Sequence, residues 1–512
     1  MTSDSTNNPS QRTRKRQPEL EFPPIFRGRH EKAVYRDPII EFFRGNPCIE
    51  ALPEDISDQQ LARLLTHHIP VTIAQRRLAA HHRDHYIEHI PRFYHPLAKA
   101  YQVHRQLQRM IRGGYVGIGR NPAELTFWDD IEQLAQSMKR DEVEGSSNPS
   151  EESMFQELSA YAGATAGSLI GVSGMGKSRT LKEILLKLFP QVIYHEAYGN
   201  RALPFQQVVW LFLECPNNAS IKALLLQFFW ALDAILNTPY YNSITRNGSM
   251  SADNLIIPMA KLALAHAIGL LVIDETQNVN QAASGGDQRI LNLFVKLINW
   301  VGIPVLLIGT PEAMTPLTAK FRMARRMSGQ GDPKWGRMQR DDVDWDMFVE
   351  ALWTHQYLRK TTPLTPDLKE ALYSASTGIT EVAVRTFMFA QRHAIARAAR
   401  PSDEQLTPQL ITSIPLSELG LMEPVLNALR EGKEQGIERI NDVKMETPSA
   451  IPDEDVGFAP PPARTQVQDH GAAQAPTLTN RLLVACAEQP AELSVYERLK
   501  RAGFTRPVTE FL

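Results

Sequence analysis

The pattern Gly-x-x-x-x-Gly-Lys-Ser at residues 171–178 is the part of this sequence that most directly suggests chemistry. Glycines let a backbone wrap closely around phosphate oxygens and point its N–H groups inward. A helix beginning here adds the partial positive charge of its N-terminus. We expect Lys177 to reach the outer phosphates of a nucleoside triphosphate and Ser178 to ligate Mg²⁺. The alternative is a chance glycine-rich turn. The predicted phosphate-binding residues are Ser173, Gly174, Met175, Gly176, Lys177, Ser178 and Arg179.

Two acidic residues follow the apolar run at 270–273. A carboxylate at the carboxyl end of a buried strand lies at the edge where open α/β sheets bind ligands. Asp274 is expected to hold Mg²⁺, directly or through water, and Glu275 to act as the general base toward an attacking water. The alternative is an acidic loop at a strand end.

A polar residue, Thr310, ends the next apolar run, at 305–309. At the tip of a neighbouring strand its hydroxyl is placed to sense a terminal phosphate and to orient water. A helix-capping threonine is the alternative interpretation, and the sequence leaves both open.

Arginines supply further phosphate-binding candidates. On a helix, Arg322, Arg325 and Arg326 share one face, from which they are able to act on a neighbouring subunit's nucleotide; the alternative is a solvated basic face. Arg385 lies one to two turns into a helix for which Thr380 is the expected N-cap. Arg385 either reaches the terminal phosphate or is a surface arginine.

Candidate DNA contacts surround the start of a strongly apolar helix predicted at 221–236. Short polar side chains and a lysine at a helix N-terminus bind phosphates without reading bases, which makes Asn217, Ser220 and Lys222 candidates. Arg246, beside aromatic residues, is a weaker one. Alternatively, Ser220 or the neighbouring Asn218 simply caps the helix.

The elements that position these residues alternate between apolar runs and helical spacing. Such alternation predicts a parallel sheet buried on both faces and flanked by helices. The predicted strands are 168–172, 192–194, 208–213, 270–274 and 305–310, and the predicted helices are 177–188, 221–236, 260–267 and 289–300.

Composition divides the chain into six parts. Helical spacing at 59–66 and 71–82 lies within the second part. The predicted parts are a disordered basic tail (1–20), an N-terminal extension packing on the core (21–150), an α/β nucleotide-binding core (151–340), an all-helical lid (341–444), a flexible linker (445–480) and a short C-terminal element that regains hydrophobic residues (481–512).

Bulk composition excludes several protein classes. The formal net charge is −2, so any nucleic-acid partner must be held by a local basic patch. The three cysteines lack zinc spacing, and this lean usage suits a reducing cytosol. We find neither an apolar leader nor a membrane-length apolar run. We therefore expect a cytoplasmic protein without a membrane partner.

The strand, P-loop, acidic strand end, polar strand tip, arginine helix and helical lid together resemble AAA+ ATPases. Over most of residues 31–440 the sequence resembles one family more closely: TnsC, the AAA+ regulator of Tns-type (Tn seven-like) bacterial transposons. The segments that carry this resemblance are 33–37 (AVYRD), 45–53 (GNPCIEALP), 110–117 (MIRGGYVG), 269–275 (GLLVIDE) and 307–311 (LIGTP).

The resemblance implies binding of ATP and Mg²⁺ and ATP-dependent assembly of identical subunits into a ring or filament on double-stranded DNA. It also implies recruitment by a target-selection protein, either a site-specific DNA binder or a CRISPR-associated adaptor, and contact with transposase subunits. ATP hydrolysis would control assembly or disassembly, with the arginine helix completing a neighbour's site.

For the adenine, the resemblance points to the segment 112–122, in a strand before the core, with Tyr115, Val116 and Gly117 as contacts. The C-terminal segment 496–500 is similar to a family tail that contacts the transposase, so the resemblance implies a partner-binding tail at 481–512. Alternatives remain: an AAA+ loader of another DNA-processing enzyme, a nucleotide-gated scaffold without hydrolysis, and a P-loop small-molecule kinase.

Overall fold

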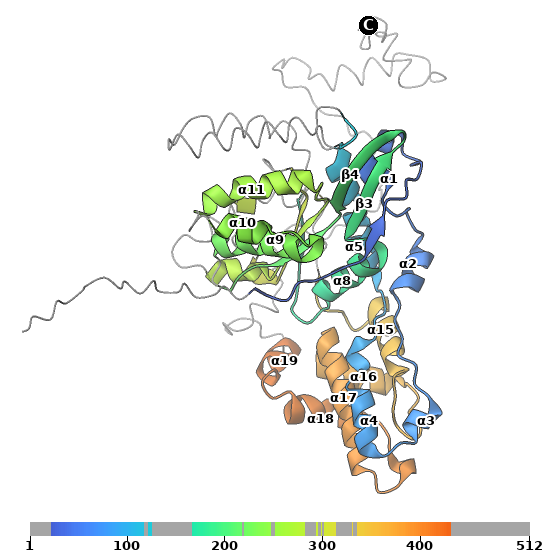
Figure 1. The fold of residues 1–512 in the computed structure, drawn as a ribbon. Helices are drawn as coiled ribbons and strands as arrows, with labels where there is room; N and C mark the ends of the chain where they lie inside the picture. The colour runs from blue at the N-terminus through green and yellow to red at the C-terminus, as the bar shows by residue number, and fades with distance from the viewer. Residues whose placement is uncertain are drawn as a thin grey trace, which may run out of the picture. The chain divides into compact units, whose positions relative to one another are not determined.

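The chain separates into two units, residues 1–447 and 448–512, and every residue described below belongs to the first (Figure 1). A computed structural model describes residues 22–116, 121–124, 166–217, 220–246, 251–281, 293–294, 298, 302–313, 330 and 335–431. The predicted tail at 1–20, linker at 445–480 and partner-binding tail at 481–512 lie outside these residues, as does the predicted helix at 289–300 apart from three positions.

A four-stranded parallel sheet forms the centre of the fold, as the apolar runs predicted. Its strands are β2 (Ala166–Ile170), β5 (Leu211–Glu214), β6 (Leu271–Asp274) and β7 (Val305–Gly309). Their residues are buried except for the partly exposed Glu214. The spatial order is β2-β7-β6-β5, so β7 lies between the strand leading into the P-loop and the strand ending in Asp274.

Helices cover this sheet. Helix α8 (Lys177–Leu188) follows the P-loop and α9 (Ile221–Leu236) follows β5, both with the predicted bounds. The predicted helix at 260–267 is the second half of α11 (Ala252–Ala265), which begins earlier because Ser251 caps its N-terminus. The short α10 (Tyr240–Thr245) packs on α9.

A second, three-stranded sheet was not predicted, and the strand predicted at 192–194 belongs to it rather than to the parallel sheet. It joins β1 (His30–Lys32) to a hairpin of β3 (Val192–Tyr198) and β4 (Arg201–Val208). The predicted strand at 208–213 is wrong as a single element. It spans the end of β4 and the start of β5, and the fully buried Val209 and Trp210 connect the two sheets.

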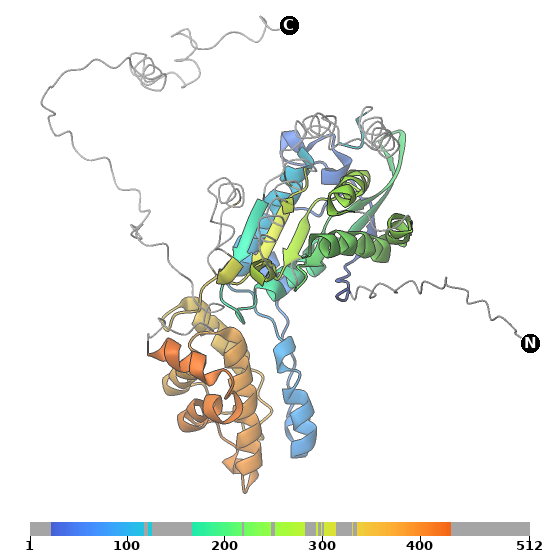
Figure 2. The same cartoon turned by 90° about the vertical axis from the view of Figure 1, so that its left-hand side faces the viewer.

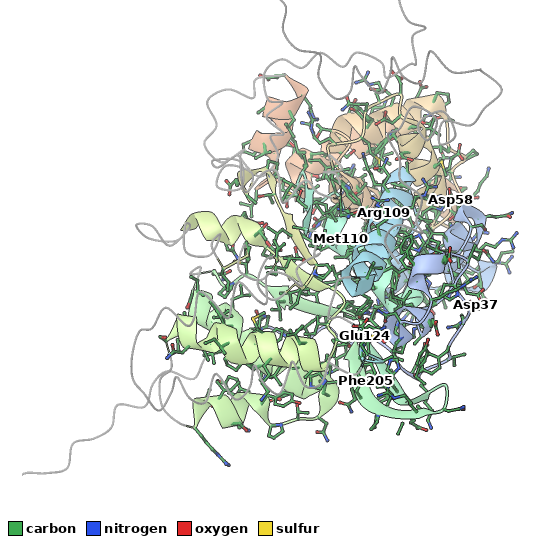
Figure 3. The ribbon with its side chains drawn as sticks, turned by 90° about the horizontal axis from the view of Figure 1, so that it is seen from above. Asp37, Asp58, Arg109, Met110, Glu124 and Phe205 are labelled. Atoms are coloured by element: carbon green, nitrogen blue, oxygen red, sulfur yellow. The ribbon has the colours of Figure 1, made fainter. Side chains whose placement is uncertain are left out.

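The N-terminal extension is mostly helical. The helix predicted at 59–66 corresponds to α2 (Asp58–Leu65). The helix predicted at 71–82 is two helices, α3 (Ile73–Arg76) and α4 (Ala80–Ile87), with an interruption at 77–79. The long α5 (Ala98–Val116) packs on α8 and β2. On this helix Met110 is buried, whereas the neighbouring Arg109 donates a hydrogen bond to Gln330 Oε1 at 3.0 Å (Figure 3). These elements are η1 (Glu41–Phe43), α1 (Pro47–Glu50), α2 (Asp58–Leu65), α3 (Ile73–Arg76), α4 (Ala80–Ile87), η2 (Ile90–Arg92) and α5 (Ala98–Val116).

The described residues after Asp342 form helices joined by loops, without a strand, as expected for the helical region that we call the lid. They are α15 (Val343–Trp353), α16 (Pro366–Ser376), α17 (Thr380–Arg397), η6 (Pro401–Asp403), α18 (Pro408–Glu418) and α19 (Glu423–Arg430). The expectation that Thr380 is an N-cap is wrong. Ile379 is the N-cap, Thr380 is already helical, and its hydroxyl bonds outside the helix.

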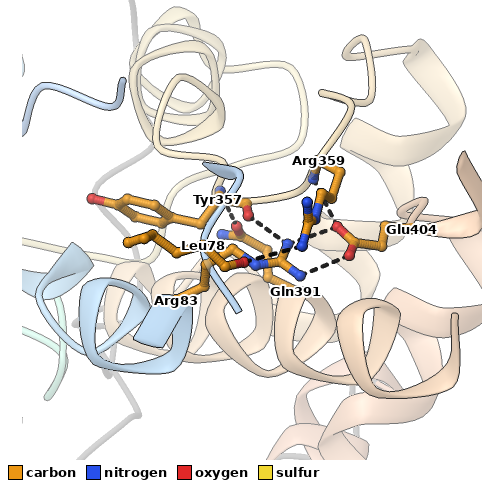
Figure 4. A network of polar contacts seen from close by, with 6 residues as sticks. All are labelled: Leu78, Arg83, Tyr357, Arg359, Gln391 and Glu404. Carbon is orange, nitrogen blue, oxygen red and sulfur yellow. Dashed lines mark hydrogen bonds and ion pairs between the residues drawn. The ribbon is translucent and has the colours of Figure 1, made fainter. Parts of the chain in front are cut away.

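Helix α4, from the N-terminal extension, packs on α17 of the lid (Figure 2). A buried ion pair joins the two regions: the Arg83 guanidinium donates to both carboxylate oxygens of Glu404 at 2.7 Å and to Tyr357 O at 2.9 Å (Figure 4). Gln391 and Arg359 extend this network. The extension therefore contributes to the lid as well as to the core. No helix in the described ranges has the length and apolarity needed to cross a membrane.

Candidate nucleotide-binding site

The P-loop connects β2 to α8, as its sequence predicted. Gly174 and Gly176 have φ values of 76° and 80°, in the left-handed region that glycine enters without strain. Gly176 is also the N-cap of α8, which directs the helix's free N–H groups at the loop. The Lys177 ammonium donates to Gly171 O at 2.7 Å and Val172 O at 2.9 Å, so it lies within the loop.

The carboxyl edge of the sheet gathers the acidic residues beside this loop. Asp274 is 5% exposed, and its Oδ1 accepts from the backbone N–H of Glu275 at 2.9 Å. Glu275 has φ 57°, a conformation that costs a non-glycine residue energy and that is frequent at functional sites. Its exposed carboxylate accepts from the Gln277 amide.

Thr310 reaches the same edge from β7. Its side chain is buried, and within the described residues its hydroxyl has no hydrogen-bond partner. This hydroxyl caps no described helix, so the capping alternative loses its support. Gln277 was not among the predicted site residues. Its side-chain oxygen accepts from Thr310 N at 3.3 Å and its side-chain nitrogen donates to the Glu275 carboxylate, so this amide connects Thr310 to Glu275.

A third carboxylate, Glu214 on β5, lies in register with Asp274. Burial raises the pKa of Glu214; Lys182 opposes this shift, and Asp274 and Glu275 add to it. The described residues hold no group of three or more His, Cys, Asp or Glu side chains arranged for a metal. The Ser178 hydroxyl and the Asp274 carboxylate are nevertheless the hard oxygen donors that would hold Mg²⁺ here, and the ion would neutralise charge on bound phosphate.

A cavity of about 770 Å³ adjoins the P-loop. Its walls come from the P-loop, the segment 91–95 of the N-terminal extension, and one face of α17. Aromatic side chains line it, among them Phe93, Tyr94 and Phe389. A mainly apolar cleft of this size with a few polar groups fits a nucleotide-sized ligand.

Hydrogen bonds tie the P-loop and α8 to these walls. Trp335 Nε1 donates to Met175 O at 3.1 Å, and Tyr94 donates to the Thr180 hydroxyl at 3.0 Å. Arg179, predicted to bind phosphate, instead donates to the carbonyls of Pro91 and Arg92. Tyr94 and Trp335 were not anticipated, because no sequence motif links them to the P-loop.

Two of the three predicted adenine contacts, Tyr115 and Val116, do not line this cavity. Residues 112–116 end a helix rather than form a strand. Tyr115 is fully buried, its hydroxyl donates to Ala267 O at 2.9 Å, and it packs against Gly269, which precedes β6. It therefore lies at the amino edge of the sheet, opposite the P-loop. Val116 does not line the cavity, and Gly117 lies outside the described residues.

The remaining predicted site residues differ in where the structure places them. Arg385 lines the cavity and pairs with Glu381. Ser220 caps α9 by accepting from Ala223 N, and Asn217 accepts from the Asn278 amide, so both have structural roles. Lys222 lies in the first turn of α9 and Arg246 at the C-cap of α10. The predicted arginine face, Arg322, Arg325 and Arg326, lies outside the described residues.

Comparison with known proteins agrees with this geometry for the central domain. Residues 160–316 match the AAA domain family. No match was found among proteins of curated function. Among solved structures, the chain is similar to the ORC1 protein of Aeropyrum pernix, determined in complex with DNA, with 15% identity and a TM-score of 0.33. That alignment covers 53% of this chain and 65% of the other, so the chain spans less than two thirds of that protein. The central region, residues 160–316, is an AAA-type ATPase domain.

Proposed function

We propose that this protein is an ATP-dependent regulator of DNA transposition that assembles on duplex DNA and links a target-selection protein to transposase subunits. The segments resembling TnsC support the transposition role, and the AAA domain supports the ATPase. The observation that carries the ATPase proposal is that the P-loop, Asp274, Glu275 and Thr310 share the carboxyl edge of one parallel sheet, where the P-loop also lines a nucleotide-sized cavity.

The chemistry we propose assigns one task to each group. Lys177 and the P-loop N–H groups bind the phosphates, while Ser178 and Asp274 hold Mg²⁺, which neutralises charge on the phosphate oxygens. Glu275 accepts a proton from water as the water oxygen attacks the γ-phosphorus and the bond to the β-phosphate oxygen breaks. Thr310 orients that water, and Gln277 holds Glu275 in position.

We propose two DNA-contacting residues among the described ones, fewer than the four that the sequence suggested. Ser220 caps α9 and Asn217 accepts from Asn278, whereas Lys222 and Arg246 carry the positive charge that suits a phosphate contact, so these two are the described candidates. A few cations on a chain of net charge −2 bind duplex DNA weakly. We therefore propose that oligomerisation, driven by ATP, multiplies the contacts.

Glu275→Gln tests the proposal. The variant should bind ATP with unchanged affinity but hydrolyse it roughly 100-fold or more slowly, because the amide cannot accept the proton. Assemblies on plain duplex DNA, seen by negative-stain microscopy, should persist in the variant and dissolve in wild type as ATP is consumed.

Glu196→Gln, at an exposed carboxylate on β3 paired with Lys32, is the matched control and should behave as wild type. Wild-type hydrolysis in Glu275→Gln would refute the base assignment. Absence of any oligomer with ATP and DNA would refute the assembly role, whereas intact assembly without effect on a transposase would favour a loader of another enzyme.

A further inference from the structure

The first turn of α17 contacts the P-loop directly. The carbonyl of Gly174 accepts from the Thr380 hydroxyl at 2.8 Å and from the backbone N–H of Glu381 at 3.0 Å. A Cβ added to Gly174 would lie 3.2 Å from Glu381 Oε2, so the carboxylate lies against the loop. The lid is thereby anchored to the residues that would surround the phosphates.

Arg385, one turn further along α17, forms an ion pair with this carboxylate. Its Nη2 donates to Glu381 Oε1 at 2.6 Å, and both side chains line the cavity. The pair is about half exposed, so its components separate at modest cost. Among the described residues, Arg385 is the first cation along α17 that lines the cavity, and Glu381 is its ion-pair partner. Arg392, which also lines the cavity, lies about two turns further along α17 and pairs with Asp84 and Glu88.

We propose that Glu381 and the γ-phosphate of ATP compete for Arg385, so that Glu381 sets how strongly the site prefers ATP to ADP. This inference rests on the proposed ATP binding at the P-loop. With Arg385 held by Glu381, the two side chains form a pair without net charge beside the P-loop. A terminal phosphate that draws Arg385 away gains an arginine contact, while Glu381, still bonded to Gly174 O through its backbone N–H, loses its ion-pair partner. ADP has no γ-phosphate to make the exchange.

The competition makes α17 responsive to the nucleotide. Breaking the pair frees the first turn of α17 from one of its constraints, while the Thr380 and Glu381 bonds to Gly174 O remain. Glu381 is a positioning residue in this scheme, because it acts through Arg385 rather than on the reacting atoms.

The experiment measures affinities of the full-length chain for fluorescent ATP and ADP analogues. Glu381→Gln should bind the ATP analogue roughly two- to fivefold more tightly, the range expected for an exposed ion pair, with a smaller change for ADP. In an Arg385→Gln background the same substitution should have no effect on the ATP-to-ADP ratio. Glu370→Gln, which removes an exposed carboxylate of α16 outside the cavity, should match wild type.

The outcomes separate the inference from the proposed function. Unchanged or weakened ATP affinity in Glu381→Gln, with wild type binding ATP normally, overturns the competition alone. An equal gain for Glu381→Gln with and without Arg385 also overturns it, since that result requires only charge repulsion. Failure of wild type to bind ATP overturns the proposed function, and the competition with it.

Discussion

The hydrogen bonding of the Thr310 hydroxyl indicates whether this residue has a structural or a catalytic role. A buried hydroxyl without a hydrogen-bond partner costs stability, because water has been removed and nothing replaces it. The Thr310 hydroxyl is in this position among the described residues, at the strand tip between the P-loop strand and the Asp274 strand. We infer that it is retained for a ligand oxygen rather than for the fold.

Thr310→Val therefore separates stability from activity. Valine keeps the shape and removes the hydroxyl, so the free energy of unfolding should stay constant or rise slightly. The rate of ATP hydrolysis should fall at least about tenfold, as expected when a donor in an active site is lost. Urea unfolding and phosphate release measure the two effects. Lower stability with unchanged hydrolysis would identify Thr310 as a structural residue.

At the scale of elements, the N-terminal extension and the lid are held together by a buried charge. The side chains of Arg83 on α4 and Glu404 after η6 are 2% and 5% exposed. Removing one member of such a pair leaves the other charged and unpaired in a low-dielectric environment. The sequence separation of 321 residues makes this contact a tertiary one.

Arg83→Met should lower the free energy of unfolding by about 3–5 kcal/mol, because Glu404 loses its partner. The double variant Arg83→Met/Glu404→Leu should recover part of this loss, since no unpaired charge remains. Arg105→Met, which breaks an exposed pair with Asp58, is the control and should cost less than about 1 kcal/mol. Equal effects of the two single arginine substitutions in urea unfolding would contradict the role of burial.

The β3–β4 hairpin contains a titratable group in its packed face. His195 accepts from the Tyr35 hydroxyl at 2.9 Å, donates to Gln207 Oε1 at 2.9 Å and stacks on Phe205. Burial lowers the pKa of His195 to about 4, and the hydrogen bond to Gln207 opposes the shift only in part. The folded protein thus holds this imidazole neutral where the unfolded chain protonates it.

Stability should consequently fall as the pH is lowered from about 6.5 toward 4. In that window the unfolded state binds a proton that the folded state does not, and protonation favours unfolding. The contribution of His195 between pH 7 and pH 5 is about 2 kcal/mol. Other histidines with lowered pKa values add to the wild-type slope, so urea unfolding of His195→Gln at both pH values isolates this one. Identical slopes in variant and wild type would show that His195 does not titrate as described.

At the scale of the whole molecule, net charge constrains the DNA binding that we propose. A chain of charge −2 offers each duplex only a few cationic contacts, and affinity must come from repetition. ATP-dependent assembly supplies that repetition in the function we propose.

DNA affinity should therefore require ATP and fall steeply as salt rises from roughly 50 to 200 mM, because each subunit in an assembly releases its own counterions. Fluorescence anisotropy with labelled duplex measures this, and Lys177→Ala, which removes the P-loop ammonium, should abolish the ATP-dependent part. High-affinity binding by the monomer without nucleotide would contradict the mechanism.

The sequence by itself determined the parallel sheet, the helices α8 and α9, and the all-helical region after Asp342. Apolar periodicity is a local property, and it specifies which residues a strand or helix must bury. The P-loop and acidic strand end were likewise readable, because the phosphate chemistry needs those residue types in a fixed local order.

Only the tertiary structure decided which distant residues meet. It placed Tyr115 at the edge of the sheet away from the P-loop, brought Tyr94 and Trp335 to the nucleotide cavity, and paired Glu381 with Arg385 beside Gly174. It also divided the apolar run around Val209 between two sheets. Most of these outcomes depend on packing between segments far apart in the chain, and such contacts leave no periodic pattern in either segment alone.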